Sequence, residues 1–129
     1  MLNTNTPYFP RASAEALITS FCAGHMVSVS RRMEVSADLK RMVGPDEVWT
    51  MCFRRPRPGG RMLGRFLERD VFVGMGLYLR EDLAGAAYAE KARIIVDSWA
   101  ERTEGLPYLG SAALSDYLGH VYMDRDQED

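Results

Sequence analysis

The chain has 129 residues, is 47% hydrophobic and 26% charged, and carries a formal net charge of −2, a composition that is ordinary for one globular domain. No stretch approaches the roughly 18 apolar residues of a membrane-spanning helix, and residues 1–13 lack the basic and apolar regions of a signal peptide. Only Cys22 and Cys52 are present, far apart, which favours reduced, buried thiols in a cytoplasmic protein without a membrane partner.

The two ends of the chain differ in composition from its middle. Residues 1–12 are polar and interrupted by prolines, which predicts a flexible arm. Residues 124–129 form a short acidic tail. We therefore expect one α+β domain over residues 13–123.

Two helices are expected in the first third of the chain. Apolar residues at helical spacing, with Gly24 as a stop, predict the first over residues 14–23. Residues 26–35 fit a short strand or a frayed helix nearly equally well. Ser36, as a cap, favours a second helix over residues 37–43.

From Asp46 the apolar period changes to two, which is typical of β-strands. Three short strands are predicted over residues 46–54, 61–67 and 71–79, joined by the loop RRPRPGG and by a tight turn. Consecutive strands with short connections form an antiparallel meander, to which residues 26–35 would add a fourth strand.

Helical spacing returns in the last third of the chain. An apolar stripe predicts a long helix over residues 86–103, ended by Gly105, and another helix over residues 112–122, capped by Ser111. The fold class is therefore α+β, with an antiparallel sheet of three or four strands between two N-terminal and two C-terminal helices. The inward positions are Tyr88, Ala92, Ile95 and Trp99 in the long helix and Leu114, Tyr117, Leu118 and Val121 in the last one.

The strand register predicts which side chains share a sheet face. A two- or four-residue turn keeps Arg61 and Arg65 away from the aliphatic positions of the next strand. Trp49, Met51 and Phe53 then face an aliphatic core, which we expect the long helix to cover. The opposite face is the candidate binding site, and a glycine pair leaves a notch in it. Besides the two arginines it carries Thr50, Cys52, Arg54, Phe72, Gly74, Gly76, Tyr78 and Arg80.

Arg54, Arg55 and Arg57 extend this candidate site into the loop. Guanidinium groups beside exposed aromatic rings can neutralise phosphates and stack on bases. Alternatively, the prolines and glycines only form a hairpin turn that the arginines keep soluble, or the arginines pair with the acidic C-terminal helices. For Gly74 and Gly76, a β-bulge or a closely packed helix is favoured over the approach of a ligand.

Charge is distributed unevenly along the chain. Residues 31–65 carry nine basic and four acidic side chains, whereas residues 66–129 carry six basic and thirteen acidic ones. Such a chain either closes on itself electrostatically or presents basic and acidic surfaces to different partners. In a homodimer, the basic face of one chain could meet the acidic helices of the other. Fourteen arginines against two lysines also suggest a GC-rich bacterial genome.

The sequence contains no known catalytic motif and no cofactor-binding fingerprint. Cys22 with His25, and Asp116 with His120 and Asp124, have helical spacing but offer too few ligands for a metal. We expect no cofactor and no metal, and the sequence favours a protein that is not an enzyme.

The order of features over residues 36–102 resembles the RelE/ParE/HigB-type toxin domain. The stretches DLKRMVGPDEVWTMCFRR and GGRMLGRFLERDVFVGMGLYL, followed by a helix, are similar to the meander and charged helix of that family. The resemblance implies that Arg61, Arg65, Tyr78 and Arg80 occupy positions that grip and cleave messenger RNA. Unlike most such toxins, this chain is acidic overall.

The sequence supports three functional hypotheses. The first is an interaction domain that binds nucleic acid or an acidic protein surface through its arginine–aromatic sheet face. The second is a ribonuclease-like toxin relative, active or degenerate. The third is a structural homo-oligomer without a ligand.

Overall fold

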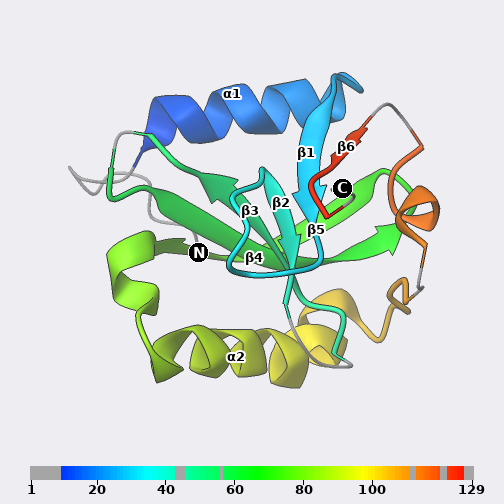
Figure 1. The fold of residues 1–129 in the computed structure, drawn as a ribbon. Coiled ribbons are helices and arrows are strands. Elements are labelled where there is room, and N and C mark those ends of the chain that lie inside the picture. Colours follow the sequence, from blue (N-terminus) through cyan, green and yellow to red (C-terminus); the bar gives the residue numbers. More distant parts are fainter. Residues whose placement is uncertain (1–9, 43–45, 56, 111–112, 120–121, 127–129) are drawn as a thin grey trace.

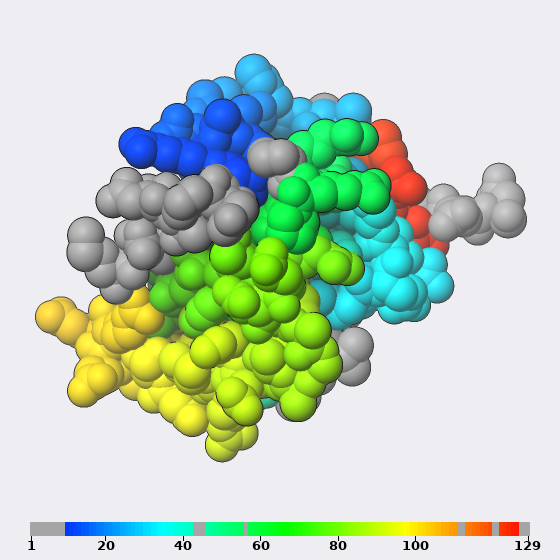
Figure 2. Space-filling model, turned by 90° about the vertical axis from the view of Figure 1, so that its left-hand side faces the viewer, coloured from blue at the N-terminus to red at the C-terminus, as the bar shows by residue number. Residues whose placement is uncertain are grey.

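The computed structural model describes residues 10–42, 46–55, 57–110, 113–119 and 122–126. A β-sheet forms the middle layer of the molecule, and one helix covers each of its faces (Figure 1). Helix α1 (Arg11–Cys22) lies on one face and helix α2 (Ala86–Thr103) on the other. Figure 2 shows the side of the molecule on which the connection between the third and fourth strands (green) lies near the start of α2 (yellow-green).

Within the described residues the sheet has six strands, in the order β5-β4-β3-β2-β1-β6. Strand β1 pairs in parallel with both β2 and β6, and the remaining neighbours are antiparallel. In chain order the elements are β1 (Val27–Ser30), β2 (Leu39–Arg41), β3 (Trp49–Phe53), β4 (Gly60–Glu68), β5 (Val71–Leu79), the 3₁₀ turn η1 (Arg80–Leu83), the 3₁₀ turn η2 (Leu114–Asp116) and β6 (Tyr122–Asp124).

This mixed sheet corrects the predicted fold class. A meander of three or four antiparallel strands is wrong as a description of the sheet, although β3, β4 and β5 are consecutive antiparallel neighbours near the predicted positions. Residues 26–35 contain the strand β1. Of the four predicted helices, the described residues show α-helix only where it is expected over 14–23 and 86–103.

Residues 39–41 form strand β2 in place of the predicted helix over residues 37–43, whose last residue lies outside the described part of the chain. The backbone N–H of Asp38 donates to a carbonyl of β1 at 3.0 Å, and the N–H of Cys52 donates to the carbonyl of Asp38 at 2.8 Å. Strands on both sides therefore satisfy the backbone of this segment. The segment forms a strand despite its helical sequence pattern because strand formation depends on tertiary context.

The predicted last helix, over residues 112–122, is also wrong. Its described part holds η2 and the start of β6, while residues 112, 120 and 121 lie outside the described residues. The N–H of Gly119 donates to Oδ1 of Asp70 at 2.8 Å, which ties the segment to the β4–β5 turn. The inward positions that can be checked are nevertheless confirmed, since they are buried: Leu114, Tyr117 and Leu118.

An aromatic core lies between α1 and the sheet. Trp49 and Phe66 are fully buried, and their rings meet edge to face at 5.3 Å between centroids. Tyr117, from the C-terminal segment, packs against Trp49 at 4.9 Å. Met51 and Phe53 belong to the same core, as predicted. The helix that covers this face is α1, however, and the expectation that the long helix covers it is wrong.

Helix α2 covers the opposite face, which carries Arg61 and Arg65. Its side chains form a second core with Leu63 of β4. The inward stripe predicted for this helix is confirmed, with two residues buried and two half-buried: Ile95, Trp99, Tyr88 and Ala92. The sheet face predicted as an open binding surface is therefore largely internal.

The β4–β5 hairpin keeps the predicted register at one end only. Arg61 and Tyr78 lie opposite each other, as expected. A register shift follows Leu63, so that Phe72 lies opposite Phe66 and packs against its ring at 5.2 Å. Phe72 therefore belongs to the aromatic core, and its predicted place on the arginine face is wrong. The physical reason is that a β-bulge moves the residues beyond it to the other face.

Candidate anion-binding pocket

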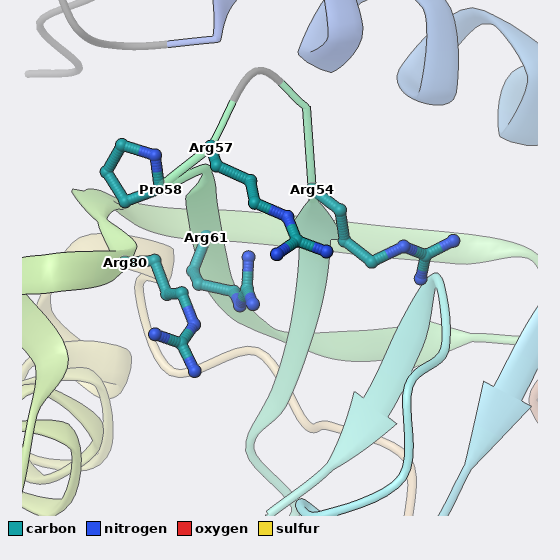
Figure 3. A pocket seen from close by; sticks show the side chains of 5 residues that line it. All are labelled: Arg54, Arg57, Pro58, Arg61 and Arg80. Atoms are coloured by element: carbon teal, nitrogen blue, oxygen red, sulfur yellow. The ribbon is translucent and has the colours of Figure 1, made fainter.

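Four arginines and Pro58 line a pocket of about 360 Å³ at one end of the sheet (Figure 3). The guanidinium groups of Arg57, Arg61 and Arg80 lie around one space, whereas Arg54 reaches toward β2. We call this the arginine pocket. It combines the end of β3, the β3–β4 connection, the start of β4 and the start of η1.

The β3–β4 connection and η1 are held together by backbone contacts. The N–H of Arg80 donates to the carbonyl of Gly59 at 2.9 Å. Gly59 has a φ of +86°, and a Cβ at this position would lie 2.6 Å from the carbonyl oxygen of Phe53. Glycine is therefore required for the loop to return so closely. The close return of the loop at Gly59 thus helps to bring Arg57 into the same pocket as Arg80.

Three of the four arginines lack a carboxylate partner among the described residues. Arg54 pairs with Asp38 at 2.8 Å. Arg61 is only 8% exposed, and its Nη1 donates to the carbonyl of the preceding residue at 2.8 Å. Arg57 and Arg80 are exposed. A nearly buried guanidinium is costly without a counter-charge, so the pocket favours an anion.

Lys40 adds a further cation beside the pocket. Its Nζ donates to a backbone carbonyl of the β1–β2 connection at 2.9 Å. Burial lowers the pKa of Lys40, and the charges of Arg61, Arg54 and Arg80 lower it further, against the opposite effect of Cys52. These cations therefore repel one another. A bound anion would counteract this effect and favour the protonated amine.

Beneath the start of α2 the sheet face is polar. Neither Oγ1 of the fully buried Thr50 nor Oη of Tyr88 has a hydrogen-bond partner among the described residues. Burial raises the pKa of Tyr88 to about 12, while the side chains of Thr50 and Arg61, which lie close to the phenol, counteract this shift in part. Burial also raises the pKa of the Cys52 thiol, which Arg61 counteracts. At neutral pH the phenol and the thiol therefore keep their protons.

A larger cavity of about 600 Å³ adjoins the arginine pocket, because Arg61 and Arg80 line both. We call it the groove. Its walls come from the β1–β2 connection, the end of β2, η1 and the first turn of α2. Besides Lys40 and Glu81, the lining is mostly apolar: Met33, Met42, Leu83, Ala84, Tyr88 and Ala89.

Arg65, a predicted site residue, is not part of the arginine pocket. It is 2% exposed, and its Nε and Nη2 donate to the carbonyl of Asp46 at 3.0 and 2.7 Å. Its guanidinium lies 3.7 Å from the ring centroid of Tyr108 and 5.4 Å from that of Trp99. This arginine is held inside the fold by a carbonyl and two aromatic faces.

The other predicted residues also lie outside the pocket. Arg55 is exposed and lines a different cavity, beside α1. No notch exists at the glycines, since a Cβ on Gly74 would lie 2.5 Å from Sδ of Met62 and one on Gly76 would lie 2.7 Å from the ring of Tyr78. The β-bulge that the sequence favours for these glycines is present between them.

Sequence reasoning misses Lys40 and Tyr88. Lys40 is assigned there to a helix, so that no sheet face is considered for it, and Tyr88 is counted only as an apolar position of α2. The prediction that both cysteines are buried holds for Cys52 alone, because Cys22 is exposed. Nothing in the sequence pattern indicates which end of α2 lies over this part of the sheet.

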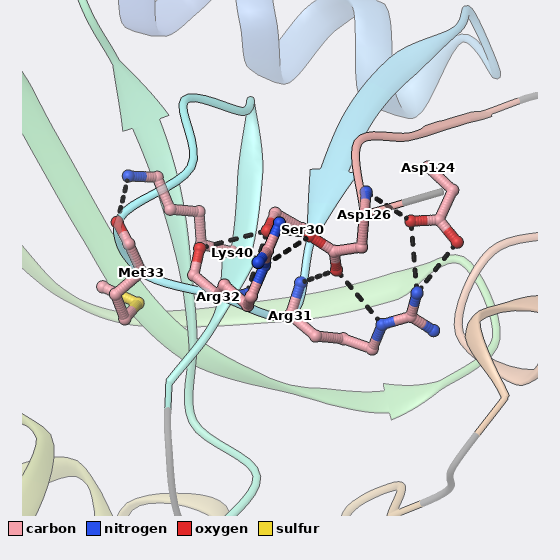
Figure 4. Close-up of polar contacts among 7 residues, drawn as sticks. All are labelled: Ser30, Arg31, Arg32, Met33, Lys40, Asp124 and Asp126. Carbon is pink, nitrogen blue, oxygen red and sulfur yellow. Dashed lines mark hydrogen bonds and ion pairs between the residues drawn. The ribbon is translucent and has the colours of Figure 1, made fainter. Parts of the chain in front are cut away.

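Just beyond β1, Arg31 and Arg32 form ion pairs with Asp124 and Asp126, in contrast to the arginine pocket (Figure 4). Asp126 accepts hydrogen bonds from Oγ of Ser30 at 2.7 Å, the backbone N–H of Arg31 at 2.6 Å and the guanidinium of Arg31 at 3.2 Å. Arg31 also pairs with Asp124 at 2.9 Å. The part of the predicted acidic tail that the structure describes is therefore structural, while residues 127–129 lie outside it.

Asp126→Asn is expected to destabilise the protein by about 1–2 kcal/mol at neutral pH. Burial raises the pKa of Asp126, but hydrogen bonds from Arg31 and Ser30 outweigh it and hold the pKa below its usual 3.8. The ionised form thus stabilises the fold above pH 3.8, and this contribution is lost as the pH falls through the lowered pKa. Urea denaturation should show that the gap between wild type and variant closes in acid.

Asp97→Asn is the matched control for Asp126→Asn. Asp97 pairs with Arg93 on the exposed side of α2, where its side chain is 61% accessible. Such surface pairs contribute little, so we expect a change below about 0.5 kcal/mol at every pH. An Asp126→Asn variant as stable as this control would show that the C-terminal strand is not held by the Asp126 contacts.

The described part of the chain contains no group of three or more His, Cys, Asp or Glu residues that could hold a metal, and His120 lies outside it. Within the same part, no helix combines the length and the hydropathy needed to cross a bilayer. No protein-family model, curated protein or solved structure matches this chain. The resemblance to RelE/ParE/HigB-type toxins therefore stays a prediction.

Proposed function

We propose that the protein binds a phosphate-bearing ligand in the arginine pocket. The observation that carries this proposal is the convergence of Arg57, Arg61 and Arg80 on one concave pocket without carboxylate partners among the described residues. Guanidinium groups match the geometry of phosphate oxygens and form strong, charge-assisted hydrogen bonds with them. Burial lowers the pKa of Lys40, and repulsion from the neighbouring arginines lowers it further; a bound dianion would offset this repulsion.

The geometry favours a single anionic group over a broad acidic surface. The sheet face that the sequence offers to nucleic acid or to an acidic protein lies under α2, and Arg65 is buried there. A pocket of about 360 Å³ is at the lower end of the range for small-molecule sites. The proposed acidic partner is therefore a molecule that places one phosphate group in the arginine pocket.

Cleavage of RNA, as the toxin resemblance implies, is a second hypothesis. Arg61 lies opposite Tyr78 across the β4–β5 pair, and Arg80 lines the same pocket as Arg61. Arg65, the fourth implied residue, is engaged by the carbonyl of Asp46. Burial raises the pKa of Tyr78, which makes it a poor general base at neutral pH. Binding without cleavage is therefore the better supported reading.

Calorimetric titration with inorganic pyrophosphate tests the proposed function. We expect saturable binding at low salt that weakens as salt is added. Replacing both Arg57 and Arg80 by alanine should weaken it by at least about tenfold, because each removes a charge-assisted hydrogen bond. Both side chains are exposed, so the double variant is expected to fold like the wild type.

Arg55→Ala is the matched control for the titration. Arg55 lies in the same loop and carries the same charge, but it does not line the arginine pocket. We expect its affinity to stay within about twofold of wild type. Absence of saturable binding at low salt, or an equal loss in the Arg55 variant, would overturn the proposal. Incubation of the same samples with single-stranded RNA tests the toxin hypothesis. Light scattering of these samples tests the homo-oligomer hypothesis.

A further inference from the structure

We infer that the ligand is a phosphate monoester with an apolar body, whose phosphate occupies the arginine pocket and whose body occupies the groove. This inference rests on the proposed function and adds the chemical class of the ligand. Its basis is that Arg61 and Arg80 line both cavities, so that the cationic site and the apolar site lie next to each other and share two guanidinium groups.

The size of the groove favours an organic body over a bare anion. Its volume is about 600 Å³, which lies within the range of small-molecule sites. An inorganic phosphate bound by the arginines would leave this space filled only by solvent. Since Arg61 and Arg80 line both cavities, a monoester held by them in the arginine pocket can place its substituent in the adjoining groove.

The chemistry of the groove favours an apolar substituent. Met33 and Met42 line one wall and Leu83 another. Methionine side chains are flexible and polarisable, so they adapt to bodies of different shapes. Ala89 leaves room next to the ring of Tyr88. Burying alkyl or aryl groups against such walls increases affinity in proportion to the apolar area removed from water.

Besides Lys40 and Glu81, which line the groove, two hydroxyl groups make part of this region polar. The hydroxyl of Tyr88 has no hydrogen-bond partner among the described residues, and it lies near Arg61. Oγ1 of Thr50, which is fully buried, also lacks a hydrogen-bond partner among the described residues. Helix α2 begins directly after Gly85, which lines the groove and supplies no side-chain cap. The positive end of this 18-residue helix therefore adds to the charge of the arginines.

One carboxylate shares this region. Glu81 lines the groove but not the arginine pocket. It repels a polyanion that fills the groove, whereas a monoester places its charge in the arginine pocket, which Glu81 does not line. This arrangement favours an amphipathic monoester over a nucleic-acid backbone.

A homologous series of ligands tests the inference. The probes are inorganic phosphate and methyl, butyl and hexyl phosphate, each titrated into the full-length protein by calorimetry. Each buried methylene is worth roughly a fourfold gain in affinity when fully covered. With partial cover, we expect hexyl phosphate to bind at least about tenfold more tightly than methyl phosphate.

Ala89→Leu is designed to fill the groove without changing the arginines. Ala89 is exposed on α2, where leucine is well tolerated in a helix. The gain from methyl to hexyl phosphate should fall below about threefold, while inorganic phosphate should bind within about twofold of wild type. Ala100→Leu, an exposed position of the same helix that does not line the groove, should keep the full gain.

Each outcome has a definite meaning. If neither inorganic phosphate nor the esters bind, the proposed function falls and this inference with it. If the esters bind but methyl and hexyl phosphate have equal affinity, the inference is overturned and the proposed function stands. The inference also fails if a single-stranded RNA oligomer binds more tightly than hexyl phosphate, or if Ala100→Leu abolishes the gain as Ala89→Leu does.

Discussion

Gly64→Ala is expected to destabilise the protein by about 3 kcal/mol or more. Gly64 lies in β4 at the register shift, and a Cβ there would lie 1.9 Å from the carbonyl oxygen of Val73 and 3.0 Å from Cα of Gly74. Both atoms belong to the backbone of the paired strand β5, so the clash can be relieved only by moving that strand. Urea denaturation, followed by the fluorescence of the buried Trp49 and Trp99, measures the loss.

Gly110→Ala is the control for the loss of glycine. The nearest atom to a Cβ at Gly110 is Cγ of Glu47 at 3.4 Å, an ordinary contact. We expect a change within about 0.5 kcal/mol. If Gly64→Ala were equally mild, the close approach of β4 and β5 would be disproved, and with it the bulge that places Phe72 on the opposite face from Arg61.

The elements that could be predicted from the sequence are those whose partners are close in the chain. Strands β3, β4 and β5 are joined by short connections, so their alternating pattern is sufficient to identify them. Strands β2 and β6 are only three residues long and are defined by pairing with β1, which β6 reaches from the other end of the chain. Such short segments carry no periodic signal of their own, and pairing with neighbouring strands of the sheet decides their structure.

The candidate site could be predicted in part, for the same reason. Local hairpin chemistry brings Arg54, Arg57 and Arg61 together, and the register at the start of β4 correctly places Tyr78 opposite Arg61. The part of the sheet face that is covered depends on the direction in which α2 crosses it. No local sequence pattern specifies this direction. The sequence predicts an open arginine face, but in the structure only the end of this face that α2 leaves uncovered is accessible.

Arg61 and Arg65 have the same role in the sequence pattern and different roles in the structure. Both belong to β4 and face α2. Arg61 lies near the first turn of the helix, where Tyr88 and the two cavities are found. Arg65 lies near its last turn, where Trp99 and Tyr108 cover it. Position along the covering helix thus separates a residue of the candidate site from a structural one.

Arg65→Ala is expected to destabilise the protein by about 2–4 kcal/mol. The change leaves the carbonyl of Asp46 without the two hydrogen bonds that it accepts from Arg65, and it removes the guanidinium from the ring of Tyr108. The space it vacates is 2% exposed in the wild type, so water cannot readily replace these contacts. Urea denaturation measures the loss, and calorimetry with pyrophosphate should give an affinity within about twofold of wild type for the folded variant.

Arg65→Lys separates the contribution of charge from that of shape. Lysine keeps the positive charge but has no planar group to stack on Tyr108 and to donate twice to one carbonyl. We therefore expect it to recover less than half of the stability that alanine loses. Full recovery by lysine would mean that charge alone matters at this position. Loss of pyrophosphate binding in Arg65→Ala at unchanged stability would return Arg65 to the binding site, and the division between the two arginines of β4 would be wrong.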